Sequence, residues 1–196
     1  MATIAFASAK GSPGVTTAIP ALAATWPAAR DLVVVELDPA GGDLVVRFDL
    51  ATEPGLVTLA AAGRRELGPD TLLAHTQVLP AAADTVGPAR RGGLSRALAG
   101  VDADVLVDCG RLDPASVAHE IATTADLLVM VARPVVAEVH HLSARLASVK
   151  ASSVSLLLVG DQPYSVSEVA GTVGANALGT LPADVPQAIK DLEPYF

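Results

Sequence analysis

The sequence predicts an α/β fold, a doubly wound and mostly parallel sheet with helices on both faces, from three observations. Five short aliphatic runs have the length and valine content of buried strands. Helical stretches separate these runs, and alternation of strand and helix is typical of a parallel sheet. Apolar residues make up 51% of the 196 residues, but Phe, Trp and Tyr only 3%, so Ala, Val and Leu must form the core.

The elements follow one another in a regular order. The expected strands are Thr3–Ala7, Leu32–Leu37, Asp104–Val107, Leu127–Val131 and Ser155–Val159. The expected helices are Thr16–Trp26, Leu94–Leu98, Val135–Ser148 and Ser165–Val173. The last helix opens with Ser165 and has Glu168 three residues on, which is a capping-box pattern. We expect Trp26 to pack the first helix against the sheet.

Between the second and third strands the pattern is weaker. It favours helices near Val57–Ala62 and Asp70–Leu73 and a strand near Thr76–Leu79. The run Gly87–Gly93 favours a solvated loop over a binding site. No repeat, linker or low-complexity tract divides the chain, so residues 1–196 are predicted to form one domain.

Charge and cysteine content exclude some classes of function. The formal net charge is −8, whereas a broad grip on nucleic acid needs clustered Lys and Arg. The single cysteine, Cys109, excludes an internal disulfide framework and fits a reducing compartment, so we expect a cytoplasmic protein. The sequence shows no signal peptide and no uncharged stretch of about 20 apolar residues, so no membrane anchor is expected.

A glycine-rich loop follows the first expected strand and leads into a helix. It reads Lys10-Gly11-Ser12-Pro13-Gly14-Val15-Thr16-Thr17. Glycines allow the backbone to point several N–H groups at one anion, and the start of the helix adds unpaired N–H groups and a positive dipole end. The Thr16 hydroxyl is placed to reach a Mg²⁺ ion and the Thr17 hydroxyl a phosphate oxygen. The loop is therefore predicted to hold the phosphates of a nucleotide.

Acidic residues end two further expected strands. Asp38 closes the run Glu36-Leu37-Asp38 before Pro39, and Asp108 follows the third strand. Because ligands of a parallel sheet bind beyond the carboxyl ends of its strands, Lys10, Asp38 and Asp108 are expected at one edge. One carboxylate can hold the water shell of Mg²⁺ and another can orient an attacking water. The alternative is a plain glycine-rich turn beside unrelated strand ends.

At these residues the sequence resembles the ParA/MinD family of P-loop ATPases, in the branch with a deviant Walker A loop. That loop has the pattern Lys-Gly-Gly-x-Gly-Lys-Thr-Thr. The matching residues are Lys10, Gly11, Gly14, Thr16 and Thr17, and the departing ones are Ser12 and Val15. The resemblance continues through Glu36–Pro39, through Asp104–Asp108 as the Walker B strand, and through Leu181–Asp184. It implies a P-loop NTPase fold over nearly the whole chain.

The resemblance also implies roles for particular residues. It implies a homodimer around two ATP molecules, with Lys10 reaching the partner's phosphates. Asp38 would position the hydrolytic water, and Mg²⁺ would be served by Thr16, Asp38 and Asp108. The nucleotide would contact the loop residues from Lys10 to Thr17, and Pro163 and Pro182 lie where the family contacts the base. Because members of the family place cellular cargo, a protein partner is implied as well.

Val15 stands where the pattern has the lysine that touches the terminal phosphates, which leaves Lys10 as the only cation of the loop. Since charge stabilisation is most of the catalysis in phosphoryl transfer, weak or absent ATP hydrolysis is expected. Two functions stay open. Retained Lys10, Asp38 and Asp108 favour an ATP-dependent dimerisation switch that positions a cellular machine. Val15 favours a scaffold or adaptor that no longer needs nucleotide. An enzyme using another phosphorylated ligand would require further catalytic groups.

Overall fold

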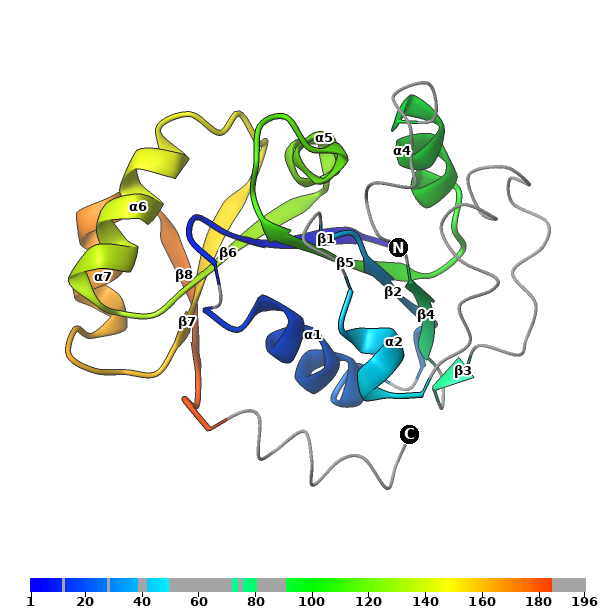
Figure 1. Cartoon of the computed structure of the whole chain (residues 1–196), viewed down its shortest axis with the longest axis horizontal. Coiled ribbons are helices and arrows are strands. Elements are labelled where there is room, and N and C mark those ends of the chain that lie inside the picture. The colour runs from blue at the N-terminus through cyan, green and yellow to red at the C-terminus, as the bar shows by residue number, and fades with distance from the viewer. Residues whose placement is uncertain are drawn as a thin grey trace.

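The computed structural model describes residues 1–11, 13–27, 29–38, 42–49, 72–73, 76–80 and 91–184. Its centre is an eight-stranded sheet with the order β3-β4-β2-β5-β1-β6-β7-β8 (Figure 1). The strands from β4 to β8 in this order run parallel, and β3 pairs antiparallel with β4 at the edge. The predicted doubly wound, mostly parallel α/β fold is confirmed.

The described elements match most of the predicted ones. The strands are β1 (Thr3–Ser8), β2 (Leu32–Glu36), β3 (Leu72–Leu73), β4 (Thr76–Pro80), β5 (Asp104–Arg111), β6 (Leu127–Ala132), β7 (Val154–Val159) and β8 (Asn176–Leu181). The helices are α1 (Val15–Ala24), α2 (Leu44–Arg47), α4 (Arg91–Ala99), α5 (Val117–Thr124), α6 (Val136–Leu146) and α7 (Val166–Val173). The capping box predicted at Ser165 and Glu168 is present at the start of α7.

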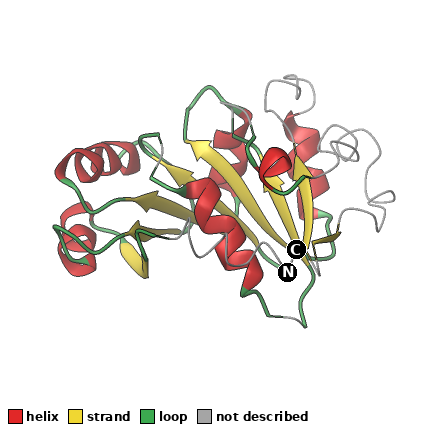
Figure 2. Cartoon of the chain, turned by 60° about the horizontal axis from the view of Figure 1, so that its bottom comes forward, coloured by secondary structure: helices red, strands yellow, loops and turns green. Residues whose placement is uncertain are grey.

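Two apolar clusters hold the layers together, one on each face of the sheet. On one face, α1 packs against the sheet through a cluster that includes Ile19, Phe6 and Leu106. Figure 2 shows α1 lying across this face. On the other face, helices α4 to α7 share a cluster that includes Leu142 and Leu128. Small aliphatic side chains allow helices to approach the sheet closely, which is how a core with few aromatic residues reaches dense packing.

A buried carboxylate fixes the amino-terminal edge of the sheet. Asp104, at the start of β5, accepts hydrogen bonds from the Trp26 indole N–H at 3.1 Å and the Arg30 guanidinium at 2.6 Å. It also accepts one from the Ala2 amide at 2.9 Å. Trp26 is partly buried against the α1 cluster, so it packs the first helix against the sheet as predicted.

Some predicted elements are wrong. Residues Leu72–Leu73, predicted as helical within Asp70–Leu73, form strand β3, because pairing with β4 overrides a weak local preference. The run Gly87–Gly93 was predicted as a loop, but from Arg91 onward it belongs to the first turn of α4. The strand at Thr76–Leu79 is confirmed as β4. The helix predicted at Val57–Ala62 lies outside the described residues.

Three elements were not predicted from the sequence, namely α2, α5 and β8. Helix α5 carried a readable start signal, since the Ser116 hydroxyl caps it by accepting a hydrogen bond from the His119 amide at 3.2 Å. Strand β8 has glycine and asparagine in place of the β-branched residues that mark a strand, which hid it. Across the described ranges, no helix combines the length and apolar character that a membrane crossing requires.

Candidate functional site

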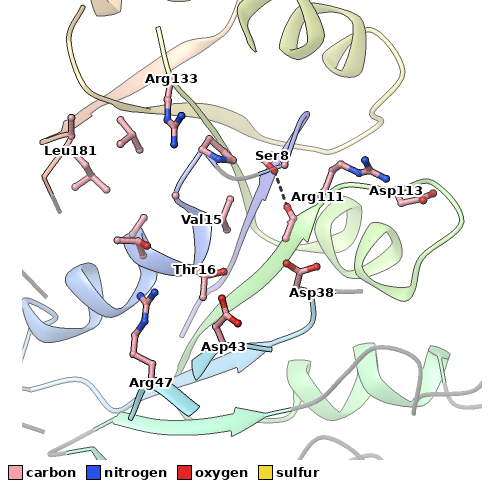
Figure 3. A pocket seen from close by; sticks show the side chains of 18 residues that line it. Ser8, Val15, Thr16, Asp38, Asp43, Arg47, Arg111, Asp113, Arg133 and Leu181 are labelled. Carbon is pink, nitrogen blue, oxygen red and sulfur yellow. Dashed lines mark hydrogen bonds between the residues drawn. The ribbon is translucent and has the colours of Figure 1, made fainter. Parts of the chain in front are cut away.

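A cavity of about 890 Å³ opens at the carboxyl edge of the parallel strands (Figure 3). Its lining comes from the glycine-rich loop, from α1 and α2, and from the ends of strands β1, β5, β7 and β8. The lining residues from the loop and α1 are Gly11, Pro13, Gly14, Val15, Thr16, Thr17 and Ala18. The sequence predicted a ligand site at this same edge of the sheet.

The loop delivers the start of α1 to the cavity. Gly14 is the N-cap of this helix with φ 110°, a conformation that strains residues with a side chain. Gly14 has no side chain to cap the helix, and no side-chain cap is present among the described residues, so the first amides of α1 keep their donors for a ligand. Thr16 and Thr17 stand in this first turn and line the cavity. The loop thus has the form that an anion site requires. Ser12 lies outside the described residues.

Val15 lines the cavity, and its side chain does not fill the cavity. Its side chain is 5% exposed and belongs to the apolar cluster on the α1 face. Further apolar lining residues, Val159, Leu181 and Ala183, come from the β7 and β8 side. One side of the cavity is therefore apolar and suits a flat, uncharged part of a ligand.

Two carboxyl groups meet beside Thr16. Gly110, near the end of β5, has φ 55°, and a Cβ at this position would overlap the carboxyl group of Asp38. Only glycine therefore allows Asp38 to lie against the end of β5. Asp38 lines the cavity, whereas Asp108 lies behind the lining with a side chain that is 0% exposed.

Asp108 is a buried residue, and one of its two carboxyl oxygens accepts a hydrogen bond. Its Oδ1 accepts a hydrogen bond from the Gly110 amide at 2.9 Å, and Oδ2 has no hydrogen-bond partner among the described residues. Burial raises the pKa of Asp108 from its usual 3.8 to about 6, and the negative charges of Asp38 and Asp43 add to the rise. The Thr16 side chain and the Gly110 amide pull this pKa the other way. A cation beside Thr16 would offset the cost of burying the charged Asp108 carboxylate.

Glu36 holds the start of α2 in place. It is 1% exposed, and its Oε1 accepts hydrogen bonds from the amides of Asp43 at 2.7 Å and Leu44 at 3.0 Å. A Cβ at Gly42 would overlap the Glu36 carboxyl group. Burial raises the pKa of Glu36, while the two amides lower it. Glu36 therefore positions a short helix whose Asp43 and Arg47 line the cavity.

The cavity is also lined by three arginines that were not predicted from the sequence, namely Arg47, Arg111 and Arg133. Lys10 remains the only cation within the loop, but it is not the only cation at the site. Arg111 is paired with Ser8 in the parallel register of β1 and β5, which places it beside the start of the loop. Each arginine ends or follows an element at the ligand edge, and this position was the signal that could have identified it.

The predicted site residues fall into three groups. Gly11, Pro13, Gly14, Val15, Thr16, Thr17 and Asp38 line the cavity, and Asp108 lies directly behind it. Lys10 is exposed, and Lys10, Pro163 and Pro182 are not among the lining residues, so their roles stay predictions. Residues close to the two prolines in sequence, such as Val159 and Leu181, line the wall in their place.

The arrangement fits a magnesium–phosphate ligand. Within the described residues, no three His, Cys, Asp or Glu side chains lie close enough together to hold a metal ion by themselves. Mg²⁺ in proteins usually takes one or two carboxylates and completes its shell with water and phosphate oxygens. Thr16, Asp38 and the unpartnered oxygen of Asp108 supply such a partial set. The residues present therefore fit the metal.

The fold is shared with proteins of known structure. No family model and no curated protein matches the sequence. Among solved structures, a ParA family ATPase from Chlorobium tepidum has 16% identity and a TM-score of 0.73, over 99% of this chain and 88% of that chain. The septum site-determining protein MinD from Pyrococcus horikoshii, complexed with Mg-ADP, has 16% identity and a TM-score of 0.75, over 100% of this chain and 86% of its own.

A third solved structure, a complex with ATP, has the same fold. The McdA–ATP complex from Cyanothece has 15% identity and a TM-score of 0.69, over 100% of this chain and 94% of that chain. At such identities the comparison shows the fold. This chain therefore has the α/β fold of these ParA and MinD proteins, and the likeness covers 99% or more of the chain.

Proposed function

We propose that this chain is an ATP-binding switch of the ParA/MinD type. It binds ATP with Mg²⁺, forms a homodimer in that state, and through a protein partner positions or regulates a cellular machine. One observation carries the proposal: one cavity lies at the uncapped start of α1, is lined by Thr16 and Asp38, and has behind it a buried Asp108 oxygen without a hydrogen-bond partner among the described residues. The solved structures of the same fold include complexes with Mg-ADP and with ATP.

Each part of the cavity has a role in this proposal. The amides of the loop and the Thr17 hydroxyl bind the phosphates, because unpaired amides at a helix start favour an anion. Thr16, Asp38 and Asp108 would hold Mg²⁺, and the metal would supply charge that neutralises the phosphates. Asp38 lines the cavity and is placed to orient a water. The apolar wall packs against the base of the nucleotide. Exposed Lys10 reaches the phosphates of the ATP bound by the partner chain.

Hydrolysis is expected to be weak or absent. Val15 brings no charge to the terminal phosphates, and its side chain is committed to the apolar cluster beneath the loop. Stabilising the charge of the transferring phosphoryl group is the main contribution of such sites to rate. Binding depends on amides, metal and several side chains together, so it persists where catalysis does not.

Val15 also favours a second function, a scaffold with the same fold that works without nucleotide. The two functions differ in one measurable property. Isothermal titration of the chain with ATP and Mg²⁺ is expected to give saturable heat, and omission of Mg²⁺ is expected to weaken it. No heat at millimolar nucleotide would leave only the scaffold. Light scattering after size exclusion, with and without Mg-ATP, tests the dimer, and a phosphate-release assay tests hydrolysis.

A matched pair of variants makes the titration specific. Thr16→Ala removes a hydroxyl that lines the cavity and should weaken binding of Mg-ATP more than binding of metal-free ATP. Thr25→Ala removes a hydroxyl at the opposite end of α1, where, within the described part of the chain, it donates to the carbonyl groups of Ala21 and Leu22. The second variant should bind like the wild type. Equal binding by both variants would remove Thr16 from the metal site.

A further inference from the structure

We propose that Arg133 supplies, at the terminal phosphates, the positive charge that Val15 leaves out. This inference rests on the proposed function, since it concerns the same nucleotide site. It names a binding residue that the loop pattern does not contain and that comes from another strand. The ligand feature it recognises is the β- and γ-phosphate end of a nucleoside polyphosphate.

The strand register places Arg133 beside the loop. Strand β6 runs parallel to β1, and Val131 is paired with Ser8, the last residue of β1. Arg133 follows Val131 by two residues, just as Lys10 follows Ser8. Arg133 is therefore at the level where the loop leaves the sheet, and it lines the cavity.

The face of the strand agrees with this position. Val129 and Val131 belong to the apolar cluster on the α1 face, and side chains two residues apart share a face. Pro134 follows, and a residue before proline keeps an extended conformation, so the alternation continues to Arg133. Figure 3 shows the guanidinium group of Arg133 pointing toward the loop.

Hydrogen bonds hold the backbone of Arg133 on both sides. Its amide donates to Oε2 of Glu138, in the first turn of α6, at 2.7 Å. Its carbonyl group accepts a hydrogen bond from the Val135 amide at 2.8 Å. A fixed backbone reduces the entropy lost when the side chain engages a ligand. A guanidinium group can then bind phosphate oxygens with two parallel N–H groups.

The other two arginines are placed differently. Arg111 extends toward Asp113 at the rim in Figure 3, and Arg47 stands on the four-residue helix α2 on the side of Asp43. Asp38 and Asp43 lie across the cavity from Arg133 in the same view. Asp38 and Asp43 therefore bring negative charge to the magnesium side of the cavity, and Arg133 provides positive charge on the opposite side. A polyphosphate with its metal needs this division of charge.

The test measures binding of ATP, ADP and AMP, each with Mg²⁺, by titration calorimetry. Arg133→Ala is expected to weaken ATP binding by about 10- to 100-fold, the range for a hydrogen bond to a charged group, and AMP binding by less than about twofold. Arg133→Lys should recover part of the lost ATP affinity, since it restores charge without the planar fork. The Arg133 side chain is exposed, so the melting temperature without ligand should match that of the wild type.

Lys150→Ala is the matched control, because it removes one exposed positive charge ahead of β7, at the opposite edge of the sheet. It should leave all three affinities unchanged. The proposal is overturned if Arg133→Ala binds ATP like the wild type, if it loses ATP and AMP equally, or if lysine recovers nothing. A wild-type chain that binds neither ATP nor ADP overturns the proposed function itself, which is a separate result.

Discussion

Replacing Asp108 with asparagine is expected to stabilise the metal-free protein at neutral pH and to weaken its binding of Mg-ATP. The side chain is fully buried, and burial raises its pKa from 3.8 to about 6. At pH 7.5 the wild type therefore carries a buried negative charge whose Oδ2 has no hydrogen-bond partner among the described residues. Asparagine removes the charge and keeps an oxygen for the Gly110 amide.

The magnitude follows from the shift in pKa. The native state retains the Asp108 proton at pH values where the unfolded chain has lost it, so this contribution to stability is complete below pH 3.8 and is lost as the pH rises through about 6. The full loss corresponds to about 3 kcal/mol, and about half of it is already lost at pH 5. Asp108→Asn should thus gain about 3 kcal/mol at pH 7.5 and about half as much at pH 5.

Urea denaturation at both pH values, in buffer with EDTA, measures these gains. Asp161→Asn is the control, because it makes the same change of charge at an exposed position of the loop after β7. Its free energy of unfolding should follow that of the wild type. The reasoning is refuted if Asp108→Asn is no more stable than the wild type at pH 7.5, or if its gain is equal at the two pH values. Loss of Mg-ATP affinity in the stabilised variant would separate the metal role from folding.

Two further substitutions test how the edges of β5 are built. Gly110→Ala places a Cβ against the Asp38 carboxyl group at φ 55°, so it should lower the free energy of unfolding by about 1–3 kcal/mol, and an unchanged urea midpoint would contradict this. Asp104→Asn loses the charge that binds the Trp26 indole and Arg30, and should cost about 1–3 kcal/mol. Tryptophan fluorescence reports the second change, and identical unfolding curves would exclude a role for that carboxylate.

Local sequence was enough to predict the centre of the site. The glycine-rich loop lies between a buried strand and a helix, and both elements are marked by their own residues. Asp38 follows a strand with no interruption, so its place at the ligand edge required only the parallel sheet. Each of these residues could be predicted from one short-range signal in the sequence. In the structure they line one cavity.

The contributions of Glu36, Arg111 and Arg133 depend on which strands are neighbours. Arg111 lies beside Ser8 only because β5 pairs with β1, across about a hundred residues of chain. Glu36 binds the amides of α2 only because the chain turns back on it at Gly42. The periodicity of a sequence encodes neither the order of strands in a sheet nor a turn such as that at Gly42. The loop can therefore be predicted from the sequence, whereas the side chains that surround it cannot.

Val15 exchanges charge for packing, and the surroundings of the loop make this exchange tolerable. A buried valine contributes about 1.5 kcal/mol or more by leaving water, whereas a lysine at this position would have to extend past the apolar cluster into the cavity. Arginines from α2 and the ends of β5 and β6 already bring positive charge to the cavity. In our proposal the positive side chain at the terminal phosphates therefore comes from the end of the sheet, from Arg133, and not from position 15 in the loop, while the amides at the start of α1 still bind the phosphates. Such a site can retain affinity for a polyphosphate while losing the charge that moves with the transferring group, so binding and hydrolysis become separable properties of one cavity.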